Sequence, residues 1–265
     1  MNEFSPEEKE QIFSMAENIT GNCQQGNYRR EVIISNVLRR VVVKKSPSLQ
    51  SYLQEAISDD KEFSYLISSL TIHTTEWFRE MPHYTKFDAL LREKYKESKR
   101  IKLLSTACST GEEVFSFAMV LESYKKINVR FEYEIAAFDI DPVSVEIAKK
   151  SLYALKDLPK IPANYQPFLK KMSTEDSFSF EPSVKLRCKF YTDNLVKLQN
   201  TLGQYDVVVC RNVLIYFTPD KVKLIIQTLL DKLMVGGVLI IGHSDSLNPK
   251  DFKVKSLGNS MFEKL

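Results

Sequence analysis

From Ile101 onward, the chain alternates short apolar runs with segments of helical periodicity, and this pattern limits the possible folds more than any other feature. The apolar runs are IKLLSTAC, FEYEIAAFDID, YDVVVCRNVLIYF and GGVLIIGHS, and the helical segments include EEVFSFAMVLESY, DPVSVEIAKKSLY and PDKVKLIIQTLLDKL. Strands that alternate with helices form crossover units, which place helices on both faces of one sheet. The pattern therefore predicts an α/β fold with a doubly wound, mostly parallel sheet.

Residues 1–88 follow a different pattern, with helical segments and no convincing strand. The segments are EEKEQIFSMAENI, YRREVIISNVLRRVVVKK, SLQSYLQEAI and DKEFSYLISSL. Three consecutive valines, at positions 41–43, weaken the helix prediction locally because β-branched residues favour strands. We expect a small all-helical N-terminal domain with its linker over residues 1–88 and a sheet domain over residues 89–265.

A region with four prolines interrupts the alternation between Leu152 and Asn194. The short alternating stretches FSFEP and VKLRCKFY predict a small antiparallel addition, so we expect an inserted β-subdomain at about residues 155–192. An insertion between a helix and the next strand is tolerated because it lies outside the sheet. It is either a decorated loop or a docking surface, and the sequence leaves both open.

Composition and charge exclude several classes of protein. A hydrophobic content of 43% and a charged content of 27% are typical of globular chains, and a net charge of +3 is too small to indicate nucleic-acid binding. The acidic start MNEFSPEEKEQ lacks the features of a secretory signal, and no apolar run is long enough for a membrane span. The cysteines form no CxxC pair and the histidines no HxxxH pair, so we expect a cytoplasmic protein with reduced thiols and no metal site.

The stretch STGEE, residues 109–113, follows the first predicted strand, where an open α/β sheet binds its ligand. A dinucleotide site has GxGxxG there, so that the backbone and the helix dipole hold a pyrophosphate. This chain has one glycine, Gly111, and then Glu112 and Glu113, which would repel a pyrophosphate. Carboxylates would instead neutralise the sulfonium and ammonium groups of S-adenosylmethionine, so the loop favours that cofactor.

The second predicted strand ends in AAFDID, and an acidic side chain there can accept hydrogen bonds from both hydroxyls of a ribose. Asp139 is the better placed, since Asp141 precedes Pro142 and has the position of a helix cap. Structural explanations stay open for the same residues. Glu112 and Glu113 could stabilise the helix dipole, and Asp139 could cap a turn.

Five stretches, in this order and spacing, resemble the CheR-type chemoreceptor glutamate methyltransferases. They are TIHTTEWFREMPHY, STACSTGEEVFSFAM, AAFDIDPVSVEIAKKSLY, YDVVVCRNVLIYFTPD and GGVLIIGHSDSL, of which STGEE and CRNVLIYF are the most specific parts. The resemblance runs from about Tyr28 to the carboxyl end. It implies a helical N-terminal domain, a methyltransferase sheet domain with an inserted β-subdomain, S-adenosylmethionine as methyl donor with S-adenosylhomocysteine as product, and methyl ester formation on receptor glutamates in chemotaxis.

The resemblance also implies a set of cofactor contacts, which fall on the matching motif positions His73, Thr75, Arg79, Glu112, Asp139, Asn194, Leu195, Arg211 and Asn212. Glu112 would bind the methionine ammonium and Asp139 the ribose. Asn194 and Leu195 would contact the adenine. His73 departs from the family pattern TINETxFFR, which has Asn there, and an imidazole cannot present the donor and acceptor of an amide side by side.

The resemblance implies that catalysis depends on few residues. An ionised glutamate is already a nucleophile, so methyl transfer to it needs no general base and positioning dominates the rate. The resemblance implies that Arg79 orients the incoming carboxylate or the cofactor and that Tyr216 places its hydroxyl near the reacting atoms. Without the resemblance, Arg79 is better explained as a domain-linking ion pair and Tyr216 as a buried tyrosine at a strand end.

Residues 28–45 carry six basic side chains against one acid, Glu31. At about 100° per residue, Arg29, Arg40 and Lys44 fall on one side of the expected helix. A charged run is usually a solvated face, but a positive face beside a methylation pocket would steer acidic receptor helices. We therefore expect these three residues to bind substrate; a nucleic acid would be steered in the same way but is not the expected partner.

Three functions stay open. The first is a protein-glutamate O-methyltransferase that acts on the cytoplasmic helices of chemoreceptors, and the second is a methyltransferase of RNA or of a small molecule, against which the absence of an NPPY-like motif argues. The third is a non-catalytic module that binds S-adenosylmethionine or S-adenosylhomocysteine. The segment KKMSTEDSFSF lacks the glycine of the pentapeptide-binding loops of some relatives, so we expect no tight pentapeptide binding by the β-subdomain.

Overall fold

The computed structural model describes residues 3–22, 27–172, 176–198 and 203–265. Its α-helices are α1 (Pro6–Thr20), α2 (Asn27–Val43), α3 (Leu49–Ser58), α4 (Asp60–Ser69), α5 (Pro82–Glu93), α6 (Glu112–Ile127), α7 (Pro142–Lys150), α8 (Pro182–Leu186) and α9 (Pro219–Lys232). Its strands are β1 (Arg100–Thr106), β2 (Glu132–Asp139), β3 (Tyr153–Ala154), β4 (Leu169–Lys171), β5 (Ser177–Phe180), β6 (Cys188–Thr192), β7 (Tyr205–Cys210), β8 (Leu233–Ile241), β9 (Val254–Gly258) and β10 (Met261–Lys264). Short 3₁₀ turns include η3 (Leu195–Lys197), η4 (Leu214–Tyr216) and η5 (Pro249–Asp251). In the part of the chain that is described, no helix has the length and apolar character needed to cross a membrane.

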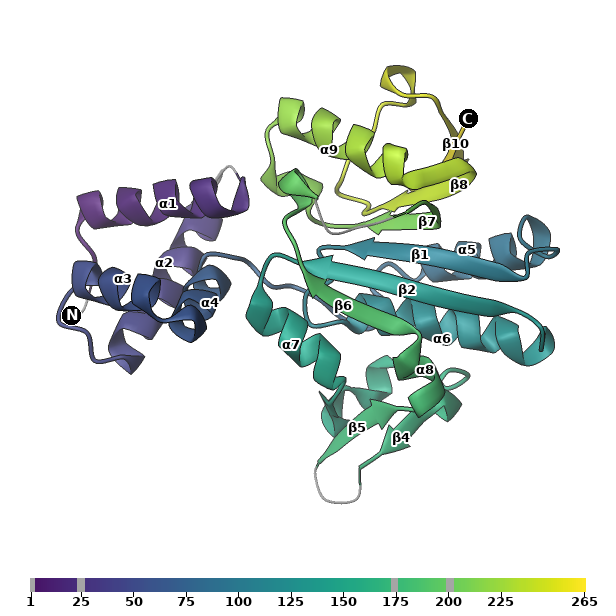
Figure 1. Ribbon diagram of the computed structural model, residues 1–265, viewed down its shortest axis with the longest axis horizontal. Coiled ribbons are helices and arrows are strands. Elements are labelled where there is room, and N and C mark those ends of the chain that lie inside the picture. The colour runs from purple at the N-terminus through teal and green to yellow at the C-terminus, as the bar shows by residue number, and fades with distance from the viewer. Residues whose placement is uncertain (1–2, 23–26, 173–175, 199–202) are drawn as a thin grey trace.

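Helices α1 to α4 gather at one end of the molecule and have a hydrophobic core of their own (Figure 1). Helix α1 begins with a capping box, in which the Ser5 hydroxyl accepts from the Glu8 N–H and the Glu8 carboxylate accepts from the Ser5 N–H. The predicted helices are confirmed, and α2 continues through the three valines because Val41 is buried in this core. The division of the chain into two domains at residue 88 stays a prediction.

The main sheet has seven strands in the order β6-β2-β1-β7-β8-β10-β9 (Figure 1). The first five are parallel to one another, and β10 is antiparallel to both β8 and β9. Strand order reverses next to β1, since the chain runs outward from β1 to β2 on one side and returns to β7 on the other. The predicted doubly wound, mostly parallel sheet is confirmed.

Helices cover both faces of this sheet. One face packs against α5, α6 and α7, and its core includes Phe87, Phe117 and Val145. The other face packs against α9, whose Ile226 and Leu229 are buried. Both cores therefore fix the carboxyl ends of the parallel strands at one edge, which is where open α/β sheets bind ligands.

A second, antiparallel sheet with the order β3-β5-β4 lies between α7 and α8. The sequence prediction also placed residues 184–191 in this small sheet, and that assignment is wrong. Residues 182–186 form α8, and β6 pairs in parallel with β2 at the edge of the main sheet. Alternation of buried Cys188 and Phe190 with exposed Lys189 indicates a strand, but it does not indicate which sheet the strand joins. The loop on which the pentapeptide prediction rests includes residues 173–175, which lie outside the described residues.

Candidate functional site

A cavity of about 210 Å³ opens where the carboxyl ends of β1, β2 and β7 meet the segment between α4 and α5. Its wall comes from residues 70–76 and Arg79 of that segment, residues 107–109 after β1, Glu113 of α6, residues 139–140 after β2, and residues 211–213, Ile215 and Tyr216 after β7. Ile33 of helix α2 and Asn22, two residues after the end of α1, also line the cavity, so the N-terminal helices complete the wall. The cavity lies at the ligand-binding edge that the alternating sequence pattern predicts.

The loop after β1 has a backbone that few residue types adopt. Ala107 and Ser109 have φ values of 57° and 49°, in the left-handed region, and Gly111 has a φ of 98°. A Cβ atom on Gly111 would lie 2.8 Å from the Tyr153 hydroxyl oxygen and 3.0 Å from the Cβ of Ala148. Both the conformation and the close approach of α7 therefore require glycine at position 111.

Asp139 joins this loop to the end of β2. Its Oδ2 accepts a hydrogen bond from the Ser109 N–H at 2.7 Å and its Oδ1 from the Asp141 N–H at 2.9 Å, so it does cap a turn. The side chain is buried but lines the cavity, and each carboxylate oxygen retains acceptor capacity for a ribose diol. Burial raises the pKa of Asp139, although the two backbone N–H groups oppose that shift. Asp141 caps α7 by accepting from the N–H groups of Val143 and Ser144, as predicted.

The two glutamates that begin α6 point in different directions. Glu113 lines the cavity, where it accepts a hydrogen bond from the Ser105 hydroxyl at 2.8 Å and from Arg211 Nη1 at 3.0 Å. Glu112 accepts from the Thr110 hydroxyl at 2.7 Å and is not part of the cavity wall. Burial raises the pKa of both carboxyls. Adjacent residues point about 100° apart on a helix, so only one can face the cavity; ammonium binding by Glu112 stays a prediction.

Arg211, directly after β7, is the most connected charged side chain of the site. It is buried and donates to the Glu113 carboxylate, to Glu80 Oε2 at 3.2 Å, to the Tyr84 hydroxyl at 3.2 Å and to the Arg79 carbonyl. Burial disfavours its charge, but Tyr84 and the two carboxylates outweigh burial and raise the pKa of Arg211. The guanidinium therefore joins the first turn of α6 to the segment before α5.

Asn212 is the second predicted contact after β7, and it lines the cavity with a left-handed backbone at φ 56°. Its side chain donates to Glu80 Oε1 at 2.9 Å and its backbone N–H donates to Asp245 Oδ2 at 2.6 Å. Asp245 also accepts from the N–H groups of Gly242 and Ile215. The two carboxylates thus hold the loop after β7 against the cavity.

Arg79 and Tyr216, the predicted catalytic pair, both line the cavity. Arg79 Nη1 donates to the Thr74 carbonyl at 2.9 Å. The Arg29 guanidinium stacks over the Tyr216 ring at 4.5 Å from its centroid and donates to the Ile215 carbonyl at 3.0 Å. Burial raises the pKa of Tyr216, while the positive charges of Arg29 and Arg79 oppose that shift. Tyr216 therefore lies within the electrostatic influence of both arginines.

His73 and Thr75 also line the cavity. The His73 ring contacts the hydroxyl of Thr71 at 2.7 Å, the hydroxyl of Ser144 at 3.3 Å and Asp141 Oδ2 at 3.4 Å. Both ring nitrogens thus contact protein groups near the start of α7. His73 therefore links the segment before α5 to α7 in addition to lining the cavity.

The structure does not bring Asn194 and Leu195 into the cavity wall. Asn194 caps η3 by accepting from the Val196 N–H at 2.9 Å, and its amide donates to the Ile19 carbonyl at 3.1 Å. Leu195 is buried in the core beneath α9. Their contact with the adenine stays a prediction.

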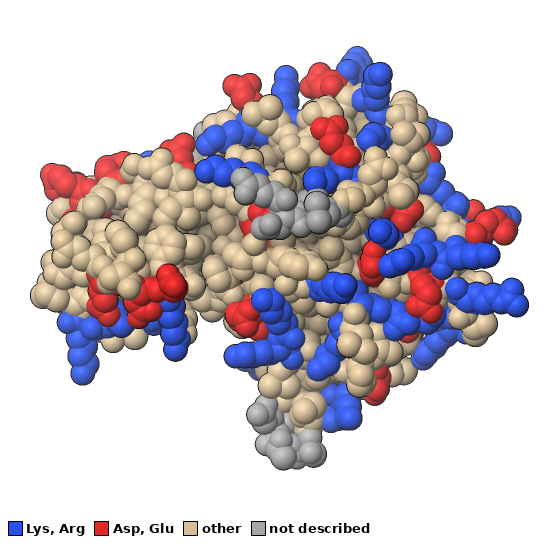
Figure 2. Space-filling view, in the orientation of Figure 1, with Lys and Arg blue, Asp and Glu red and all other residues tan. Residues whose placement is uncertain are grey.

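The predicted substrate-binding residues of α2 have protein partners. Arg40 forms a bidentate bond with the buried Glu62, with both N–O distances at 2.6 Å, and Lys44 pairs with Glu55 and Glu62. On the face shown in Figure 2, acidic and basic side chains lie next to one another at the edge of the N-terminal helices. Arg29, by contrast, lies over Tyr216 at the cavity. Substrate binding by the three residues stays a prediction.

Two polar groups of the site fit a polar cofactor. The Ser109 hydroxyl and Arg211 Nε are buried and have no hydrogen-bond partner among the described residues. Buried polar atoms are rarely left in this state, so a ligand that supplies acceptors or donors would satisfy them. Together with the acceptors of Asp139 and Glu113, they suit a ligand that carries a ribose, an ammonium and a carboxylate, as S-adenosylmethionine does.

Sequence reasoning missed Glu80 and gave Glu113 no role of its own. Glu113 could have been found, because one of two adjacent carboxylates at a helix start has to face the ligand edge. Glu80 directly follows Arg79 in the motif TTEWFRE, but the groups that donate hydrogen bonds to its carboxylate are more than 130 positions away along the chain. No local signal indicates such partners.

Comparison with known proteins gives concordant matches over most of the chain. The family model described as CheR methyltransferase, SAM binding domain, matches residues 73–261. A chemotaxis protein methyltransferase of Listeria monocytogenes is 28% identical over 242 residues, which cover 89% of this chain and 90% of the relative. One from Vibrio anguillarum is 29% identical over 84% of this chain and 83% of the relative, and chemotaxis protein methyltransferase 2 of Pseudomonas aeruginosa is 24% identical over 98% and 93%.

Proposed function

Because the chain belongs to the CheR methyltransferase family and is an S-adenosylmethionine-dependent methyltransferase, we propose that it methylates glutamate side chains of chemoreceptors, forming methyl esters. One observation carries the proposal. Asp139, the proposed ribose-binding carboxylate, shares a single cavity with Arg79 and Tyr216, whose side chains suit an incoming carboxylate. The cavity thus provides for both partners of a methyl transfer.

The residues of the cavity suit a reaction without proton abstraction. When bound, S-adenosylmethionine supplies a methyl group activated by its sulfonium. A glutamate side chain is ionised at neutral pH, so its oxygen can attack without a base. Arg79 would attract and orient that carboxylate, and Tyr216 would donate a hydrogen bond because its raised pKa keeps the hydroxyl protonated. Positioning by these two side chains would supply most of the rate enhancement.

The proposed substrates are the cytoplasmic helices of chemoreceptors, and the proposed location is the cytoplasm. Names of the relatives support a role in chemotaxis. Arg29 would contribute positive charge where an acidic helix approaches Tyr216. Arg40 and Lys44 would contribute less, because Glu62 and Glu55 already neutralise much of their charge. We propose no tight binding of a receptor pentapeptide; micromolar binding in calorimetry would contradict this.

The test is transfer of labelled methyl from S-adenosylmethionine to purified cytoplasmic fragments of chemoreceptors, with methanol released by alkali as the readout. Arg79→Ala and Tyr216→Phe should lower the alkali-labile label at least about tenfold each, the loss expected for one transition-state hydrogen bond. Matched controls are Arg130→Ala and Tyr191→Phe, which change exposed residues outside the cavity and should retain activity.

The outcomes separate the proposed function from its alternatives. Alkali-stable label, or label only on RNA or on a small molecule, would refute glutamate methylation. Binding of S-adenosylhomocysteine without label on any receptor would favour a non-catalytic binding module instead. In that case His73→Asn, which restores the amide of the family pattern, would be the first variant to assay for recovered transfer.

A further inference from the structure

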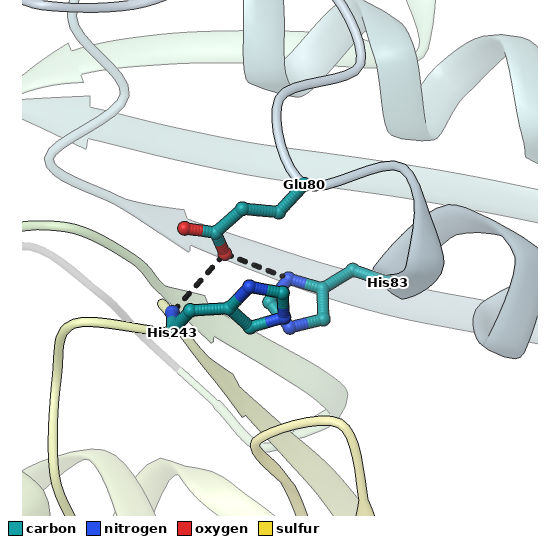
Figure 3. Close-up of side chains that lie close together, drawn as sticks. All are labelled: Glu80, His83 and His243. Carbon is teal, nitrogen blue, oxygen red and sulfur yellow. Dashed lines mark hydrogen bonds and ion pairs between the residues drawn. The ribbon is translucent and has the colours of Figure 1, made fainter.

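Outside the cavity wall, three side chains that commonly bind metals meet from distant parts of the chain. Glu80 lies just before α5, His83 lies in the first turn of α5, and His243 follows β8. One ligand atom from each lies within 4.8 Å of the other two. Figure 3 shows the two imidazole rings lying edge to face, with centroids 4.8 Å apart, and the Glu80 carboxylate beside them.

His83 has an orphaned imidazole. Its side chain is 0% exposed, and neither ring nitrogen has a hydrogen-bond partner among the described residues. The nearest charged oxygen is Glu80 Oε2, 3.3 Å from Nδ1. Burial and the nearby charge of Arg211 lower the pKa of His83 to about 4, whereas Glu80 and the backbone of Asn259 oppose that shift. A buried polar nitrogen in this state requires an explanation, and a bound cation is one.

We propose that Glu80, His83 and His243 bind one divalent transition-metal ion, for which zinc is the best match. Two imidazoles and a carboxylate are common zinc ligands, with bonds of about 2.0–2.2 Å, so donors around a tetrahedral ion lie on the order of 3–4 Å apart. Glu80 and His83 already have this spacing, and the exposed His243 can turn toward them. Solvent beside His243 offers the ion an entry path and a water as fourth ligand.

The charges around the cluster accommodate a cation. Arg211 is shared between Glu80 and Glu113, so two carboxylates face one guanidinium. Asn212 donates to Glu80 Oε1, whereas Oε2 accepts from Arg211 Nη2 and the His243 N–H and faces His83 Nδ1, so a bound ion would compete with Arg211 for this oxygen. An ion at Oε2 would fasten the segment that carries Arg79 to the loop after β8. Its role would be structural support behind the cavity rather than contact with the reacting atoms.

The experiment uses the full chain, stripped with a chelator and then titrated with zinc chloride in calorimetry and with cobalt chloride in visible absorption. We expect one ion per chain and cobalt d–d bands typical of nitrogen and oxygen ligands. His243→Ala should weaken binding at least about 100-fold, since loss of a direct ligand exceeds the 10–100-fold cost of losing an outer-shell partner. His73→Ala, which removes another exposed histidine, should bind zinc like the unchanged chain.

Each alternative outcome has a definite meaning. Zinc affinity that is equal in the unchanged chain and in His243→Ala, or absent from both, would overturn the proposal. His83→Gln should also abolish binding, with circular dichroism confirming that the variant is folded. Because the readout is metal binding and not methyl transfer, this test is independent of the proposed function.

Discussion

Replacing Asp139 with asparagine tests the cofactor site at the atom level. The amide has one acceptor oxygen, so its NH₂ must face the N–H of either Ser109 or Asp141, both of which now donate to the carboxylate. An unpaired buried donor costs about 1–3 kcal/mol of folding free energy, with or without ligand. Loss of a charge-assisted bond to a ribose hydroxyl costs a further ~1.5–3 kcal/mol, in the complex only. Affinity should therefore fall about 10- to 150-fold.

Calorimetry with S-adenosylhomocysteine measures that affinity, and Asp141→Asn is the matched control. Asp141 is also buried and also accepts two backbone N–H bonds, but it caps α7 and is not part of the cavity wall. Both variants should unfold at lower urea concentration, Asp141→Asn by more because Asp141 also accepts from the Ser68 and Ser144 hydroxyls, and only Asp139→Asn should lose affinity. If Asp139→Asn binds like the unchanged chain, or if Asp141→Asn loses as much affinity, the ribose assignment is wrong.

Two further predictions concern stability. Glu62→Gln removes a buried partner of Arg40 and should lower the free energy of unfolding by about 2 kcal/mol or more in urea titrations. The bidentate bond from Arg40 holds the pKa of Glu62 below its ordinary value of 4.5. The stability that this pair contributes is therefore complete above pH 4.5 and is lost as the pH falls through the lower pKa of the folded state. If the difference in unfolding free energy between the two chains is unchanged at pH 3, this reasoning is contradicted. Gly111→Ala should destabilise by about 1–3 kcal/mol more than Gly203→Ala, since both have positive φ but a Cβ at Gly203 meets no atom within 4 Å. Equal losses of stability in the two variants would show that α7 can shift to accommodate a Cβ atom at position 111.

The order of elements was predictable because each strand and helix has a local signature. Apolar runs of strand length between helical segments lead to a parallel sheet, since crossover connections allow little else. Strand β6 shows the limit of this reasoning. Its alternating pattern identifies a strand, but pairing with β2 depends on contacts more than 50 positions away.

Side-chain direction within the site was less predictable than its position. The motifs correctly predicted which loops meet, yet Glu112 and Asn194 are not part of the cavity wall, whereas Glu113 lines it. Neighbouring residues of a helix point about 100° apart, so one of two adjacent side chains can line a cavity while the other does not. The packing of the whole helix decides which of the two it is. His83 and His243 show the same limit for motif spacing, because they are 160 positions apart in the chain and their rings still pack edge to face.

Acidic residues of the site shape its backbone as well as its charge. Five non-glycine residues with left-handed φ lie on or beside segments that form the cavity, namely Phe78, Glu80, Ala107, Ser109 and Asn212. Such conformations cost on the order of 1 kcal/mol each and persist only where neighbours hold them. Asp139 accepts from the Ser109 N–H, Asp245 accepts from the Asn212 N–H, and Glu80 accepts from the Asn212 side chain. Each carboxylate thus stabilises a strained turn beside the cavity. Neutralising one of these acids should therefore weaken the turn that it holds as well as remove an acceptor from the cavity, and urea titration beside calorimetry measures the two effects separately.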